Sequence, residues 1–112
     1  MKKPKISENA VTNEILEYLQ WKGIFAWKNK NISTYDAKIG GFRRLGKYEV
    51  RGVSDILGIL NDGRLLAIEC KTGYNKASEA QKEFINNINN RNGIAFVAYG
   101  IDDVDKYLTK II

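Results

Sequence analysis

Three charged residues have the types and the spacing expected of a metal-assisted hydrolytic site. Glu69 and Lys71 close the apolar stretch RLLAIECK, and Asp55 opens a second apolar run, DILGIL. The sequence NDG at 61–63 lies between the two runs and predicts a tight hairpin turn, because Asn and Gly tolerate the positive φ that such turns require. The two runs are therefore expected to pair as antiparallel strands.

This pairing is expected to bring two carboxylates face to face. Asp55 and Glu69 each lie seven residues from Asp62 in the turn, so their side chains should be opposite each other on one face. Opposed carboxylates repel, and a hard divalent cation such as Mg²⁺ relieves the repulsion by binding their oxygens. Lys71 shares that face and is placed to orient a water nucleophile or to neutralise charge developing on a phosphate. The alternative is a salt-bridged strand end, in which Lys71 pairs with one of the acids.

Two further polar side chains fall close to apolar faces of predicted helices. Glu8 continues at helical spacing the apolar stripe formed by Val11, Ile15 and Leu19. A buried acid needs a partner, although an acid in a first turn can also serve the helix terminus alone. Gln81 lies in the helix after the hairpin, where a buried amide would hydrogen-bond a metal-bound water or a DNA phosphate. The alternative is an ordinary surface glutamine.

The segment KIGGFRRLGKYEVRG mixes basic, aromatic and glycine residues. This mixture suits contacts with a nucleic-acid backbone and stacking on bases, and the alternative is a solvated loop. The expected DNA-binding residues are Lys38, Arg43, Arg44, Lys47 and Arg51. Trp21 and Trp27 are interpreted as core or subunit-interface aromatics, with base stacking as the alternative.

The elements that must position these residues follow from hydrophobic periodicity. Helices are expected over 7–23, 77–93 and 102–112, and strands over 24–30, 54–60, 64–71 and 94–100, with a short additional strand around Tyr48–Val50. Ser7 is the expected N-cap of the first helix and Gly23 its end. The last strand, IAFVAYG, is continuously apolar and is expected to be buried on both faces. The order α-β-β-β-α-β-α predicts an α/β fold with a mixed sheet flanked by helices.

The composition limits the chemistry that is possible. The 112 residues fit one domain over 1–112, with 44% hydrophobic residues and a net charge of +5 that suits a polyanionic partner. There is no histidine, which excludes histidine bases and histidine metal sites, and Cys70 is the single cysteine. No apolar run approaches the roughly 20 residues of a membrane span, and the N-terminus lacks the apolar core of a signal peptide. These features favour a reducing cytoplasm.

The stretches RGVSDILGI, DGRLLAIECKTG, SEAQKEF and GIAFVAYGIDDV resemble the virus-type replication-repair nuclease (VRR-NUC) domain of the PD-(D/E)XK nuclease superfamily. The family pattern is a glycine shortly before a metal-binding Asp, then an E-x-K strand, then a helix that carries Gln. The matching positions here are Gly52, Asp55, Glu69, Lys71 and Gln81. The usual Pro before the Asp is Ser54 in this chain, and the similarity runs from about Glu8 to Leu108.

The resemblance implies a restriction-endonuclease-like fold and hydrolysis of DNA with Mg²⁺ or Mn²⁺. The implied metal ligands are Asp55, Glu69, the main-chain carbonyl of Cys70 and an acid on the first helix, for which Glu8 is the first choice and Glu14 the second. Lys71 would position or activate the attacking water, and Gln81 would support the site. The Cys70 side chain is expected to pack in the core and not to act as a nucleophile, because no histidine is present to activate it.

Some single-domain viral members of the family resemble junction resolvases, so branched DNA is the implied substrate. A resolvase cuts two strands symmetrically, which predicts a homodimer. The expected location is the cytoplasm of a bacterium or phage-infected cell. The rival hypothesis is a non-catalytic DNA-binding module on the same fold. A third is a small structural protein in which the charged residues form only salt bridges.

Overall fold

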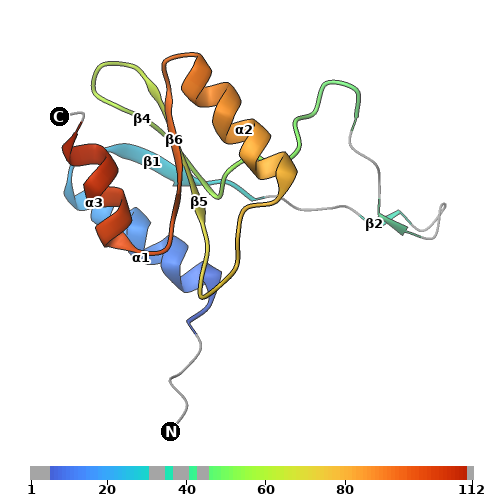
Figure 1. The fold of residues 1–112 in the computed structure, drawn as a ribbon, viewed down its shortest axis with the longest axis horizontal. Coiled ribbons are helices and arrows are strands. Elements are labelled where there is room, and N and C mark those ends of the chain that lie inside the picture. Colours follow the sequence, from blue (N-terminus) through green and yellow to red (C-terminus); the bar gives the residue numbers. More distant parts are fainter. Residues whose placement is uncertain (1–5, 31–34, 37–40, 43–45, 111–112) are drawn as a thin grey trace, which may run out of the picture.

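Four strands form one mixed sheet with helices on both faces (Figure 1). The computed structural model describes residues 6–30, 35–36, 41–42 and 46–110. Its elements are α1 (Glu8–Trp21), β1 (Phe25–Lys28), β2 (Tyr35–Asp36), β3 (Gly41–Phe42), β4 (Ile56–Ile59), β5 (Leu65–Cys70), α2 (Glu79–Asn90), β6 (Ile94–Ala98) and α3 (Ile101–Thr109). The sheet order is β1-β4-β5-β6, with β5 and β6 parallel and the other pairs antiparallel. The predicted α/β architecture with a mixed sheet is confirmed.

The turn chemistry of residues 61–63 sets the register of the central hairpin. Gly63 has φ +92°, and its N–H donates to the carbonyl of Leu60 at 2.8 Å. The strands then pair so that Ile56 lies opposite Ile68 and Ile59 opposite Leu65. This is the register predicted by counting outward from the turn.

The helices follow from their caps and apolar faces. The hydroxyl of Ser7 accepts a hydrogen bond from Ala10 N at 3.0 Å, and α1 ends before Gly23, which has φ +77°. Both predicted boundary residues of this helix are confirmed. No helix in the described part of the chain is long and apolar enough to cross a bilayer.

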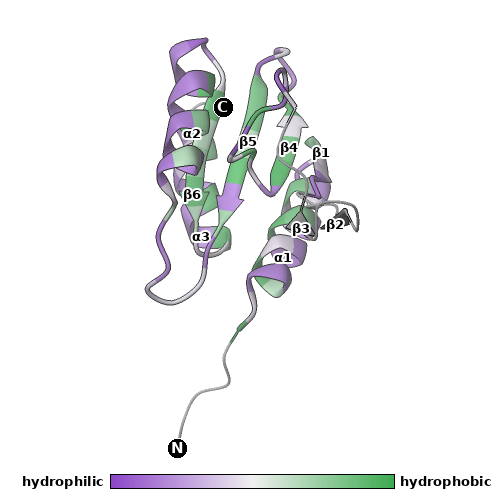
Figure 2. Cartoon of the chain, turned by 90° about the vertical axis from the view of Figure 1, so that its right-hand side faces the viewer, coloured by the Kyte–Doolittle hydropathy of each residue, from purple (hydrophilic) through white to green (hydrophobic). Residues whose placement is uncertain are grey.

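Side chains of β5 alternate between two covered faces of the sheet. Leu66, Ile68 and Cys70 belong to the main apolar core, which also contains residues of α1 and α3. Glu69 points the other way, to α2, where it meets Gln81. Figure 2 shows the apolar body of β5 giving way to a hydrophilic tip at this end. The burial of both faces explains why five consecutive residues of this strand are buried.

The continuously apolar β6 is also covered on both faces. Ala95 and Phe96 are adjacent in sequence, point to opposite sides of the sheet, and are both buried. The expectation for IAFVAYG is therefore confirmed over these residues, although β6 lies at the edge of the sheet.

The expected short strand around Tyr48–Val50 is wrong. These residues form a turn followed by a segment without strand pairing, and the side chains of Tyr48 and Val50 are largely exposed. Gly46 N donates to the carboxylate of Glu49 at 2.8 Å, so the segment is closed by a local side-chain contact instead of a ladder. The strand pairing found nearby joins β2 to β3 in a separate two-stranded sheet, in which each strand has two residues.

Candidate active site

Asp55 and Glu69 meet where β4 begins and β5 ends. The β4–β5 register, continued by one residue, places Asp55 directly opposite Glu69. Asp55 Oδ2 accepts a hydrogen bond from Cys70 N at 2.9 Å, which holds this carboxylate against the end of β5. The two acids are close enough that the charge of Asp55 acts on Glu69. The predicted pairing of the carboxylates is thus confirmed.

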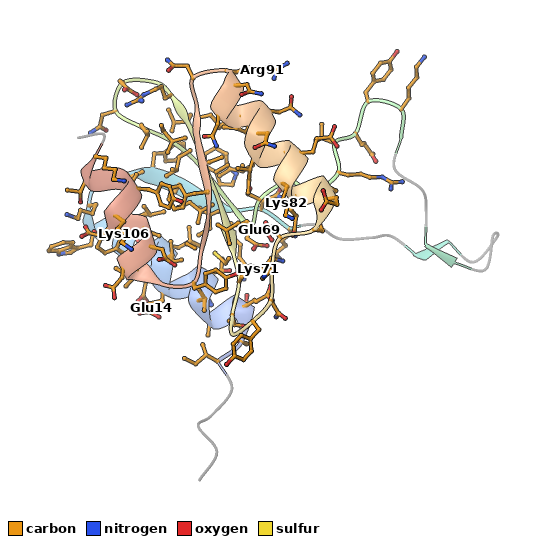
Figure 3. All side chains as sticks on the ribbon, viewed as in Figure 1. Glu14, Glu69, Lys71, Lys82, Arg91 and Lys106 are labelled. Carbon is orange, nitrogen blue, oxygen red and sulfur yellow. The ribbon has the colours of Figure 1, made fainter. Side chains whose placement is uncertain are left out.

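Glu69 is the most enclosed charged residue of the site, with only 2% of its surface exposed. Its Oε1 accepts a hydrogen bond from Gln81 Nε2 at 2.8 Å and lies 3.5 Å from Lys71 Nζ. Figure 3 shows Glu69 and Lys71 together at this end of β5, beside the start of α2. Lys71 therefore shares the face of Glu69, as the spacing predicts. The ion pair of the alternative interpretation is present as well.

The environment of Glu69 favours its neutral form. Burial and, after it, the nearby charge of Asp55 raise the pKa of Glu69 from 4.5 to about 7, while Lys71 acts in the opposite direction. The single ammonium does not offset the loss of solvent and the second carboxylate. At neutral pH this carboxyl group is therefore poised between its two protonation states.

Two buried side-chain oxygens in the described part of the chain have no hydrogen-bond partner. One is Glu69 Oε2, in this site, and the other is Ser54 Oγ, on the residue before Asp55. Orphaned buried acceptors are rare in folded proteins and require an explanation. A divalent cation between Asp55 and Glu69 would satisfy Glu69 Oε2 and offset the repulsion, so the donor set of this pair fits such an ion.

The cation would have few protein side chains as ligands. Within the described residues, no three His, Cys, Asp or Glu side chains are grouped so as to hold a metal. Two carboxylates with backbone carbonyl and water oxygens would match the way in which Mg²⁺ usually binds. The carbonyl of Cys70, next to Glu69 in the chain, stays the predicted backbone ligand.

The thiol of Cys70 takes no part in this chemistry. Its side chain is fully buried in the core, on the face opposite Glu69. Burial raises the pKa of the Cys70 thiol to about 12, which keeps it protonated at neutral pH. The interpretation of Cys70 as core packing is confirmed.

Glu8 begins α1 and is not joined to the carboxylate pair. Its Oε2 accepts a hydrogen bond from Asn75 Nδ2 at 3.0 Å, in the loop between β5 and α2. Its charge acts on the thiol of Cys70, which lies on the face of the sheet opposite Glu69. Glu14 is exposed further along α1 and away from Glu69 in Figure 3. The structure thus favours Glu8 over Glu14 as the acid nearest the site.

No family model matches this chain. Comparison with curated proteins likewise gave no match. The function of the site therefore rests on its geometry and its residue types.

Gln81 caps α2 and also contacts Glu69. Its backbone N–H donates to Ser78 Oγ at 3.2 Å, and its side-chain Oε1 accepts from Ser78 N at 2.8 Å, which together form a capping box. The remaining amide N–H₂ donates to Glu69. The S-x-x-Q spacing of SEAQ was a readable signal for the cap, and the cap fixes the rotamer that reaches Glu69.

Gly52 fixes the loop that carries Asp55 against the start of α2. It has φ +74°, and a Cβ at this position would lie 2.4 Å from the backbone carbon and oxygen of Ala80 and 2.6 Å from Gln81 N. Only glycine fits this close approach. The contact ties the elements bearing Asp55 and Gln81 into one unit.

The substitution Gly52→Ala should therefore destabilise the protein by about 3–5 kcal/mol, since a left-handed backbone and a backbone clash act together. Gly23→Ala is the matched control, because Gly23 has a similar φ of +77° but no atom within 4 Å of the place that a methyl group would occupy. It should cost only about 1–2 kcal/mol. Urea denaturation of both variants measures the difference, and equal losses would contradict the close packing at Gly52.

The expected DNA-binding residues are only partly described. Lys38, Arg43 and Arg44 lie outside the described residues. Lys47 and Arg51 are exposed, and Lys47 Nζ lies 5.5 Å from the centre of the Tyr48 ring. Their role in DNA binding stays a prediction.

The core interpretation of the two tryptophans is wrong. Trp21 is 80% exposed at the end of α1, and Trp27 is 40% exposed on the edge strand β1. Apolar periodicity cannot separate a core aromatic from one that awaits a partner. The interface and base-stacking interpretations stay open for both residues.

Proposed function

We propose that this chain is a divalent-metal-dependent DNA endonuclease. The observation that carries the proposal is the opposed pair of Asp55 and Glu69, with a buried, unpartnered oxygen on Glu69 and an ammonium 3.5 Å from the same carboxylate. Carboxylates that can hold a divalent cation and a lysine beside them are groups that can support phosphodiester hydrolysis without histidine. The order of elements and the mixed sheet support the restriction-endonuclease-like fold and the VRR-NUC resemblance.

The residues have distinct proposed roles. Asp55 and Glu69 would hold a Mg²⁺ or Mn²⁺ ion, together with the Cys70 carbonyl and with Glu8 acting directly or through water. The chemistry that such an ion supplies when bound is Lewis-acid polarisation of the phosphate. Lys71 would orient the attacking water and stabilise charge on the phosphate, while Gln81 keeps Glu69 in position.

The rival hypothesis, a non-catalytic DNA-binding module, predicts a different site. A module that only binds DNA has no use for two opposed carboxylates, because acids repel phosphates. A purely structural ion pair does not need a second acid opposite Glu69, whose charge raises the pKa of the buried carboxyl group. The geometry at Glu69 therefore favours catalysis over both alternatives.

Cleavage of a panel of labelled DNAs tests the proposal. Linear duplex, nicked, flap, fork and four-way-junction substrates are incubated with Mg²⁺, Mn²⁺ or EDTA. We expect cleavage with either metal, none in EDTA, and a preference for branched substrates. DNA binding without metal-dependent cleavage of any substrate would support the rival module.

We also expect a homodimer, since a resolvase must cut two strands. The exposed Trp21 is available to cover a partner subunit. Sedimentation equilibrium at micromolar concentration measures the state directly. A strict monomer that prefers linear DNA would overturn the resolvase part of the proposal and leave the nuclease part standing.

The basic segment should hold DNA through phosphates. Replacing Arg43 and Arg44 with alanine should weaken binding of all DNA sequences alike and reduce the slope of log K against log[salt] by about one unit per lost contact. Titrations at several salt concentrations measure this slope. An unchanged slope would remove these residues from the binding surface.

A further inference from the structure

One half of the sheet face that carries the carboxylates is not covered by α2. The helix lies over β5 and β6, while β4 and β1 extend beyond it (Figure 2). On this open half lie exposed apolar side chains in the described part of the chain, namely Phe25 at 67%, Ile59 at 42% and Trp27 at 40% exposed. The rings of Phe25 and Trp27 are adjacent, with centroids 5.3 Å apart and an interplanar angle of 49°.

The strand register joins this aromatic pair to the candidate active site. Trp27 lies opposite Leu57, which is two residues from Asp55, so all three side chains share one face. Asn29 N donates to the carbonyl of Asp55 at 2.7 Å, which brings the end of β1 level with the site. Trp27 is two residues before Asn29, or roughly 7 Å along the strand. Phe25 is the same distance further out.

The position of Phe25 and Trp27 beside the carboxylates indicates which kind of partner they contact. Gln81 and the contact between Gly52 and α2 close one side of the carboxylates. Among the described residues, the open half over β4 and β1 leaves a route by which a polynucleotide can reach Asp55 and Glu69. A second copy of the chain lying flat on this face would instead block that approach.

Stacking requires bases that are not already paired. The bases of a duplex are stacked on each other, whereas those of a single strand expose faces that aromatic rings can cover. The chain's net charge of +5 and the exposed Lys30, just beyond β1, complement the strand's phosphates. We propose that Trp27 and Phe25 form a stacking platform for unpaired bases next to the scissile phosphate.

This inference rests on the proposed nuclease function and narrows its substrate. The enzyme would prefer DNA in which one to a few nucleotides beside the cut are unpaired, as in flaps, loops or opened junction arms. Cleavage of intact duplex would then require local opening of the strands, which costs free energy.

Binding in EDTA tests the platform without any cleavage. Anisotropy titrations compare a labelled single strand with a labelled duplex of the same sequence. Trp27→Ala should weaken single-strand binding roughly five- to a hundredfold and leave duplex binding unchanged. Trp27→Phe, which keeps a ring, should retain most of the affinity. Ile59→Ala is the matched control, because it removes an exposed apolar side chain of the same open half that has no ring, and it should bind like the wild type.

Tryptophan fluorescence provides a second measurement, in which Trp27 itself stays in place. In Trp21→Phe the remaining tryptophan emission comes from Trp27, and a single strand should quench it while an abasic strand of equal length should not.

The stacking platform would be overturned by equal quenching with both strands. Equal losses of affinity for single strand and duplex in Trp27→Ala would overturn it too. A change from dimer to monomer in Trp27→Ala, with binding unaltered, would overturn it as well and assign this face to a second copy. Single-strand stacking without metal-dependent cleavage would instead refute the nuclease proposal alone.

Discussion

Replacing Lys71 with alanine is expected to lower DNA cleavage roughly 10²- to 10⁴-fold while leaving DNA binding and the fold intact. Lys71 Nζ is 3.5 Å from Glu69 Oε1 and is the only side-chain cation paired with this carboxylate among the described residues. It lies at the end of β5, where its side chain is 11% exposed. Loss of the ammonium removes both the water-orienting group and the charge that lowers the pKa of Glu69.

The control must separate this effect from a general loss of positive charge. Lys82→Ala removes an exposed lysine of α2 that pairs with Glu79 at 3.3 Å and does not contact the carboxylate pair. It should cleave like the wild type. Single-turnover cleavage at saturating protein, with anisotropy for binding and circular dichroism for folding, makes the comparison. Wild-type turnover by Lys71→Ala would show that this lysine only neutralises the strand end.

The position of the carboxylate pair could be predicted because one local signal determines it. The NDG turn fixes the hairpin, and the two-residue period of strands then fixes which side chains share a face. Asp55, Glu69 and Lys71 follow from these rules alone. Nothing further from the fold is required to bring them together.

Other features depend on contacts between elements that are distant in sequence. The partner of Gln81 is Glu69, and this bond exists because the β5–α2–β6 crossover packs α2 onto one face of the sheet. The helical pattern placed Gln81 near an inward face but could not name the group that it meets. The need for glycine at Gly52 likewise arises from the backbone of α2, which no local pattern contains.

The errors have the same physical origin. Tyr48 and Val50 have strand propensity and alternate like a strand, but no strand in the described part of the chain pairs with them. The exposed Trp27 lies on the edge strand β1, and α2 does not cover the face of β1 that carries it. Propensity and periodicity describe a segment alone, whereas pairing and coverage are decided by the whole fold.

Replacing Glu69 with glutamine is expected to abolish cleavage and, without metal, to stabilise the folded protein above pH 7. Glutamine has nearly the same shape, can still accept the hydrogen bond from Gln81, and cannot ionise. In the wild type, burial and Asp55 raise the pKa of Glu69 to about 7 from 4.5. The folded state therefore holds the proton more tightly than the unfolded state, so stability is lost as pH rises from about 4.5 to about 7.

The size of the effect follows from the same shift. A difference of this size corresponds to about 3 kcal/mol of unfolding free energy, lost across that interval and constant above it. In EDTA, the wild type and Glu69→Gln should thus be similarly stable at pH 4.5, and the variant more stable at pH 8. Glu79→Gln removes an exposed carboxylate of the same type and should show no such difference. Parallel plots of unfolding free energy against pH for the wild type and Glu69→Gln would show that folding does not raise the pKa of Glu69.

Metal should reverse this order of stability. A cation that binds Asp55 and Glu69 stabilises the folded wild type by mass action, because the unfolded chain lacks the site. Mn²⁺ should therefore raise the melting temperature of the wild type at pH 8, and leave that of Glu69→Gln almost unchanged. The raised pKa and the unpartnered Oε2 would then have one cause, since a pair of acids arranged to bind a cation repel each other in its absence. Equal stabilisation of both proteins by Mn²⁺ would place the metal elsewhere and remove the carboxylate pair from the mechanism.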